Sequence, residues 1–181
     1  MIGCFSLARE TFDIKFAKKK LATTKRIIKK LNKNINFFDE LITNDEIGKS
    51  ALKHFENIKC TKFIVIQSTF TDAKFISSFV KKFKKPILFV SFKEKRSGGR
   101  LRLNSLCGVN LGLHALIKRK FYSNFIIFTN EERSFSNEIL KFIKNKNNFT
   151  KKNYFRNINN YIFIFSTNAV IKNFDILEFF F

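Results

Sequence analysis

Residues 96–110 contain the groups best suited to bind a ligand. Gly98 and Gly99 allow positive φ angles and a close approach of the backbone to a bound group. Arg100 lies between two further arginines, so three fixed, forked hydrogen-bond donors occur within seven residues. Asn104 or Ser105 can cap the helix expected to follow, and the N-terminus of a helix presents free N–H groups. These residue types suit an anion or sugar hydroxyls; a solvated turn before a helix is the structural alternative.

Two shorter polar segments carry other candidate groups. In residues 7–13, Arg9 lies close to the start of an expected helix that a neighbouring threonine or aspartate can cap. In residues 67–72, the hydroxyls and Asp72 also suit capping, whereas Phe70 can pack in the fold or stack against a ligand. The residue types of both turns fit two alternative roles, helix capping and ligand binding.

The sequence specifies no metal site and no catalytic triad. Cys4, Cys60 and Cys107 are far apart and lack metal-ligand spacing, which predicts reduced and mostly buried thiols. Cys107 and His114 are seven residues apart, but two ligands without a third make a poor metal site. Walker, HExxH and Ser/His/Asp patterns are absent from the sequence. We therefore assign no catalytic residue and no metal ligand.

Strand-like and helix-like segments alternate along the chain. Short apolar runs typical of strands occur at residues 2–7, 34–38, 63–66, 87–90 and 125–128. Helical spacing of apolar residues occurs at residues 12–32, 44–58, 73–83 and 104–118, and a fifth helix is expected from a cap at Ser134 or Ser136. This order predicts an α/β fold: a three-layer, mostly parallel sheet with helices on both faces, of Rossmann or flavodoxin type. Ligands of such sheets bind beyond the carboxyl ends of the strands, where the three polar turns fall.

The expected domain boundary follows residue 144. Residues 1–144 form the α/β domain, and residues 145–181 are read as a linker rich in Lys and Asn followed by an incomplete C-terminal segment. No apolar run is long enough to span a bilayer, and the first residues do not have the pattern of a signal peptide. We expect a cytoplasmic protein without a membrane partner.

The formal net charge of +21 would attract phosphate backbones or anionic surfaces. The lysines, however, are spread through the sequence, and Asn, Ile and Phe are also abundant. This pattern favours a compositional origin of the charge, so nucleic acid is not expected as a partner. A basic nucleic-acid-binding α/β protein is the alternative function, and it predicts lysines gathered on one face.

The three polar turns resemble, in the same order, the N-terminal part of L-fucose/L-arabinose isomerase-like sugar isomerases. The matching segments are residues 7–13, 67–72 and 98–111, and the third is the most specific. The likeness covers about residues 1–130, and Asn173-Phe-Asp175 resembles a later Gly-Phe-Asp motif of such proteins.

The resemblance implies an enzyme that interconverts aldoses and ketoses through an enediol with a divalent metal, usually Mn²⁺. The family's metal ligands, two acidic residues and a histidine, lie in the later part of a considerably longer chain. We therefore expect Mn²⁺ in the complete enzyme, no cofactor bound by this chain, and no activity of this chain alone. A gene fragment, a frameshifted product or one half of a split protein would each explain a chain without these metal ligands.

In the family the N-terminal domain supports oligomerisation and completes the substrate site of a neighbouring subunit. The implied partners are a pentose or deoxyhexose substrate, and either further copies of the chain or a missing C-terminal half. The substrate-binding residues implied by the matching motifs are Arg9, Thr69, Phe70, Gly98, Gly99, Arg100 and Asn104. The sugar-site hypothesis predicts that Arg9, Phe70 and Gly98 converge at one end of the sheet.

Overall fold

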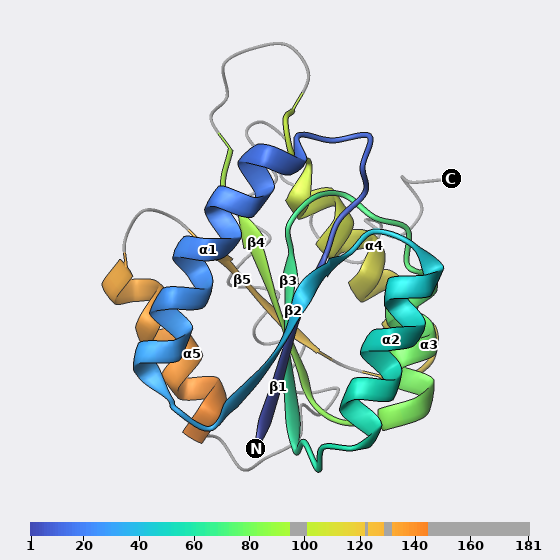
Figure 1. Cartoon of the computed structure of the whole chain (residues 1–181), viewed down its shortest axis with the longest axis vertical. Helices are drawn as coiled ribbons and strands as arrows, with labels where there is room; N and C mark the ends of the chain where they lie inside the picture. The colour runs from blue at the N-terminus through green and yellow to red at the C-terminus, as the bar shows by residue number, and fades with distance from the viewer. Residues whose placement is uncertain (95–100, 122, 129–131, 145–181) are drawn as a thin grey trace, which may run out of the picture. The chain divides into compact units, whose positions relative to one another are not determined.

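A computed structural model of the chain describes residues 1–94, 101–121, 123–128 and 132–144 (Figure 1). The strands are β1 (Ile2–Leu7), β2 (Ile35–Ile42), β3 (Lys62–Gln67), β4 (Ile87–Phe92) and β5 (Asn124–Phe128). The helices are α1 (Ile14–Leu31), α2 (Asp45–Glu56), α3 (Lys74–Phe83), α4 (Ser105–Ile117) and α5 (Glu132–Lys144). Strand and helix alternate along the whole described domain.

The five strands form one parallel sheet in the order β2-β1-β3-β4-β5. Helices α1 and α5 cover one face of the sheet, and α2, α3 and α4 cover the other (Figure 1). This arrangement confirms the expected three-layer α/β fold. The chain leaves β1 toward β2 on one side and returns to β3 on the other, so the strand order reverses between β1 and β3. Sheets of this order bind ligands at such a switch point, beyond the carboxyl ends of the strands.

The central strands are buried on both faces, which explains their continuous apolar sequences. On the side of α2 and α3, phenylalanine rings fill the core: the Phe79 ring centroid lies 4.6 Å from that of Phe5 and 4.7 Å from that of Phe63. The Cβ of any larger residue at Gly3 would lie 2.4 Å from the Phe63 ring. The absent side chain at Gly3 therefore makes room for this aromatic core.

Two elements differ from the sequence prediction. Strand β2 continues past residue 38 to Ile42, although Asp39 and Glu40 are exposed. β2 is an edge strand, where polar side chains can meet water. Its pairing with β1 shifts register between Cys4 and Ser6, opposite residues 38–40, and resumes at Leu41.

Helix α5 begins at Glu132, so neither Ser134 nor Ser136 lies at its start. Phe135, Ile139 and Phe142 are buried in the core at helical spacing. The helix must therefore begin before Phe135 to direct that ring toward the sheet.

No helix in the described part of the chain combines the length and hydropathy that crossing a bilayer requires. Residues 145–181 lie outside the described residues, and with them the predicted linker and Asn173-Phe-Asp175. The predicted domain boundary after residue 144 stays a prediction.

Candidate functional site at the carboxyl edge of the sheet

The turns after β1 and β3 lie against each other at the switch point. The Arg9 backbone N–H donates to Thr69 Oγ1 at 2.8 Å. The Arg9 guanidinium donates from Nη2 to Asp72 Oδ2, also at 2.8 Å, and its central carbon lies 5.7 Å from the centroid of the Phe70 ring. Arg9, Thr69 and Phe70 are therefore brought together, as the sugar-site hypothesis requires.

The segment that precedes α4 forms the third side of this site. The Phe70 N–H donates to the Leu103 carbonyl at 2.8 Å, and the Asp13 N–H donates to the Arg102 carbonyl at 3.1 Å. Residues 102–103 thus connect the two turns through backbone bonds. Three separate chain segments meet at one end of the sheet.

Asp13 joins the start of α1 to this segment. Its Oδ1 accepts the N–H of Phe16 at 2.8 Å, which makes Asp13, and not Thr11, the cap of the helix. Its Oδ2 accepts from Arg102 Nη2 at 2.5 Å and from Nε at 3.0 Å, and the guanidinium carbon of Arg102 lies 4.1 Å from the centroid of the Phe16 ring. The Phe16 N–H and then Arg102 hold the pKa of Asp13 below its usual value.

The start of α4 is not capped by Asn104 as the sequence predicts. Asn104 is in the left-handed conformation, with φ of 51°, and its side chain caps no N–H group. Instead, the carboxylate of Glu94 accepts the N–H groups of Leu103 at 2.8 Å and Asn104 at 2.7 Å. Glu94 thus binds the two N–H groups that directly precede α4, and its negative charge lies at the N-terminal end of the helix, where it is favourable.

Ser105, the other predicted cap, ties α4 to two strands. Its Oγ accepts the Phe92 N–H at 3.0 Å and donates to the carbonyl of Gln67. The Oδ1 of Asn104 is buried and, within the described part of the chain, has no hydrogen-bond partner. The Ser105 hydroxyl thus fixes the start of the helix to backbone groups of β3 and β4.

Two positioning residues were missed by the sequence analysis. Buried Gln67 donates from Nε2 to the Thr69 carbonyl at 2.7 Å and to Thr71 Oγ1 at 2.8 Å, which shapes the turn after β3. Glu94 is the second, through the bonds at the start of α4. The signal that could have indicated both residues is a single amide or carboxylate within two residues of the end of an apolar strand.

Four of the seven predicted site residues lie in this cluster: Arg9, Thr69, Phe70 and Asn104. Gly98, Gly99 and Arg100 lie outside the described residues. Thr69 is fully buried, and its hydroxyl accepts from Arg9. Arg9 and Phe70 are partly exposed, and they are the groups that a ligand can reach.

The described carboxylates do not fit a divalent metal. Glu94 and Asp13 each use both oxygens for N–H donors, and Asp72 accepts from Arg9 and from the Lys74 N–H. No group of three or more His, Cys, Asp or Glu residues in the described ranges is placed to hold a metal ion. A Mn²⁺ site supplied from elsewhere stays a prediction.

The three cysteines form no disulfide. Cys4 and Cys60 are buried, as expected, and burial raises the pKa of the Cys4 thiol to about 12. Cys107 is exposed, and it lies on the outer side of α4. Partial burial, and then the charge of Glu94, raise the pKa of the Cys107 thiol. None of the three is therefore poised as a nucleophile.

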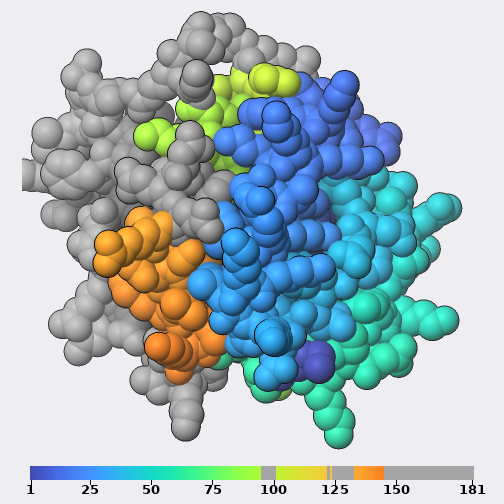
Figure 2. Space-filling model, turned by 60° about the vertical axis from the view of Figure 1, so that its left-hand side comes forward, coloured from blue at the N-terminus to red at the C-terminus, as the bar shows by residue number. Residues whose placement is uncertain are grey.

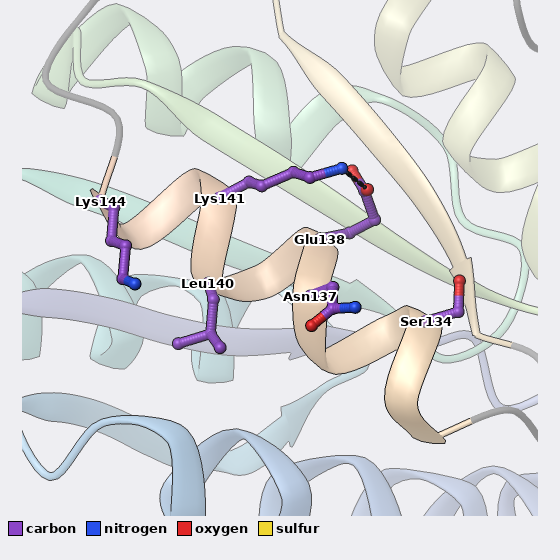
Figure 3. A pocket seen from close by; sticks show the side chains of 6 residues that line it. All are labelled: Ser134, Asn137, Glu138, Leu140, Lys141 and Lys144. Carbon is purple, nitrogen blue, oxygen red and sulfur yellow. Dashed lines mark hydrogen bonds and ion pairs between the residues drawn. The ribbon is translucent and has the colours of Figure 1, made fainter.

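A hollow of about 480 Å³ lies along α5, away from this cluster (Figure 3). Its described lining residues all come from that helix: Ser134, Asn137, Glu138, Leu140, Lys141 and Lys144. Lys141 and Glu138 form an ion pair with each other at 2.5 Å. No polar group from another described element converges there, so the hollow is not part of the candidate site.

Residues 3–151 match the family described as fucose/sulfoquinovose isomerase, N-terminal domain. The chain belongs to this family. The match confirms the resemblance to fucose isomerase-like enzymes drawn from the three turns, and it runs from the second residue of β1 through the end of α5.

Curated relatives include the sulfoquinovose isomerases of Priestia megaterium and Priestia aryabhattai. Each is 26% identical to this chain over 135 residues, which cover 75% of the chain and 30% of the relative. The sulfoquinovose isomerase of Alkalicoccus urumqiensis is 39% identical over 70 residues, covering 38% of the chain and 16% of the relative. The chain thus matches less than a third of the length of these relatives.

Proposed function

We propose that this fucose/sulfoquinovose isomerase-type domain contributes substrate contacts to an aldose–ketose sugar isomerase. The observation that carries the proposal is the meeting of Arg9, Phe70 and the start of α4 at the switch point of the sheet. Family membership indicates the class of ligand, and the position matches where α/β sheets bind ligands.

The exposed groups of the cluster suit a sugar. The half-exposed guanidinium of Arg9 offers donors to hydroxyl oxygens, and the exposed carboxylate of Asp72 offers acceptors. The Phe70 ring offers an apolar surface for the C–H groups of a pyranose. The Thr69 hydroxyl accepts the backbone N–H of Arg9, and Gln67 donates to the Thr69 carbonyl, so these two residues hold the backbone of both turns.

The reaction chemistry is proposed to lie outside the described residues. Mn²⁺ bound by another part of the enzyme would act as a Lewis acid on the sugar carbonyl and hydroxyl oxygens. The residues described here would bind and orient the sugar and exclude water from one side of it. The remaining part of the site would come from a C-terminal half or from a second copy of the chain.

Titration of the isotope-labelled chain with L-fucose and with sulfoquinovose, followed by NMR, tests the proposal. We expect amide shifts to concentrate at residues 9–13, 69–72 and 102–104. Arg9→Gln should abolish them, and Arg26→Gln, an exposed arginine on α1, should not. Shifts that are absent with both sugars, or that lie elsewhere on the domain, would refute the proposed site.

A further inference from the structure

Charge is distributed unevenly among the helices. Helix α1 carries eight basic residues and no acidic residue over 18 positions. Helix α2 carries three acidic residues against two lysines, and α4 carries no Asp, Glu, Lys or Arg. If the excess of lysine were purely compositional, the exposed faces of these helices would carry similar numbers of lysines. Helix α3 also carries three lysines and no acidic residue over ten positions, so the positive charge lies mainly on α1 and α3, with the larger number on α1.

Six of the eight basic side chains lie on one side of α1. We call them the α1 basic stripe: Lys15, Lys18, Lys19, Arg26, Lys29 and Lys30. At 100° per residue they fall within an arc of about 120°, opposite the buried Ala17, Thr24 and Ile28. All six are exposed, and they extend over roughly 22 Å of helix. The face of the molecule that carries α1 and α5 comes forward in Figure 2.

Within the described residues, the stripe side chains form few interactions with acidic groups; the charge of Lys15 acts on Asp13 without an ion pair. Among α1 lysines, Lys25 pairs with Asp39 at 3.2 Å, and it lies outside the stripe. None of the six stripe residues forms an ion pair with a carboxylate of the described ranges. Glu138 of α5, the helix that packs beside α1, is already paired with Lys141.

The row of like charges destabilises helix α1. Like charges four residues apart, as in Lys15–Lys19 and Arg26–Lys30, destabilise a helix by about 0.2–0.5 kcal/mol per pair. The packed face of α1 compensates for this repulsion. The folded domain therefore presents a dense, unneutralised row of cations that suits a polyanion.

We infer that the α1 basic stripe binds the phosphate backbone of duplex nucleic acid without sequence preference. Lysine ammonium groups act as point charges toward phosphates, and they suit contacts of this kind. Helix α1 packs along the sheet with one face, so its outer side, which carries the stripe, is the side that would lie along the phosphate backbone.

The aromatic rings near the stripe argue against stacking with single-stranded bases. Arg102 covers the Phe16 ring, and Lys29 lies 5.1 Å from the centroid of the Phe37 ring. Both rings are only partly exposed. This surface therefore offers cations for a duplex but no open ring for unpaired bases.

This binding surface is independent of the proposed sugar site. The sugar cluster lies at the carboxyl edge of the sheet, whereas the stripe follows the outer side of α1. No stripe residue belongs to the cluster around Arg9 and Phe70.

Fluorescence anisotropy with a labelled duplex DNA and a labelled duplex RNA, over a range of salt concentrations, tests the inference. The variant Lys18→Gln, Lys19→Gln, Lys29→Gln removes half of the stripe. The control Lys49→Gln, Lys53→Gln, Lys81→Gln removes the same charge from exposed positions on α2 and α3. We expect the stripe variant to lower the slope of log K against log salt by about 2–3 and the affinity by roughly tenfold or more, with little change in the control.

Both variants must show native circular dichroism for the comparison to count. Equal losses in the two variants would mean that net charge alone attracts the duplex, and they would overturn the assignment to α1. If the unchanged chain did not bind the duplex at low salt, the inference would also be overturned. Binding only to anionic phosphatidylserine vesicles would replace nucleic acid by a lipid surface.

Discussion

Most polar groups of the sugar-site cluster serve the fold as well as the site. Arg9 contributes its backbone N–H to Thr69 and its guanidinium to Asp72 and Phe70, which joins the turns of two strands. Asp13 combines a helix cap with the Arg102 ion pair. Variants of these residues will therefore change stability along with ligand binding, and the two effects need separate measurements.

Asp13 gives the first prediction, because its pKa is lowered in the folded state. A lowered folded pKa means that Asp13 stabilises the domain above its unfolded pKa of about 3.9. This contribution disappears as the pH falls through the lower, folded pKa. Asp13→Asn should therefore reduce the urea midpoint at pH 7 and leave it almost unchanged at strongly acidic pH.

Urea unfolding followed by circular dichroism at the two pH values measures this difference. Glu40→Gln, at an exposed position on β2, removes the same charge and serves as the control. An equal effect of Asp13→Asn at both pH values would contradict the role of the ionised carboxylate.

At the scale of the elements, α4 connects the site to the sheet through a close approach at Gly108. A Cβ at this position would lie 2.8 Å from Gln67 Nε2 and 3.0 Å from its Cδ. Gln67 is buried and holds the turn after β3, so it cannot move aside without losing the bonds to Thr69 and Thr71. The glycine thus sets the distance between α4 and β3.

Gly108→Ala should destabilise the domain by about 1–3 kcal/mol through overpacking, despite the better helix propensity of alanine. Gly112→Ala is the matched control on the same helix. Its Cβ would lie 3.3 Å from the Phe89 ring, where a shift of a few tenths of an ångström suffices, so we expect a change near zero. Urea unfolding of both variants decides this, and an equally stable Gly108→Ala variant would refute the close contact.

At the scale of the whole molecule, the charge of +21 opposes folding by self-repulsion. The α1 basic stripe concentrates part of that repulsion on one face. Binding of a polyanion would relieve it, and so would screening by salt.

We therefore expect the melting temperature to rise with NaCl concentration up to about 0.5 M, as the Debye length falls below the spacing of the surface charges. The Lys18, Lys19, Lys29 triple variant should show a higher melting temperature at low salt and a smaller rise. Thermal unfolding by circular dichroism measures both. A melting temperature that is flat or falls with NaCl would show that repulsion is not a significant part of the stability.

Sequence pattern alone determined the kinds of element and their order. The apolar run of residues 63–66 and the helical spacing of residues 73–83 are local signals, because burial of a strand or a helix face requires them. Alternation of strands and helices then predicts a parallel sheet, and the polar turns follow at its carboxyl edge. The resemblance of those turns identified the family, which the match over residues 3–151 confirms.

Only the tertiary structure decided which polar groups meet. Arg9 and Asp72 are 63 residues apart in the chain, and their pairing depends on the crossover that places β1 beside β3. The same holds for Glu94, whose carboxylate accepts the N–H groups of Leu103 and Asn104 directly before α4. The lysines that share one side of α1 follow from their spacing in the sequence, but only packing on the sheet decided that this side is the exposed one.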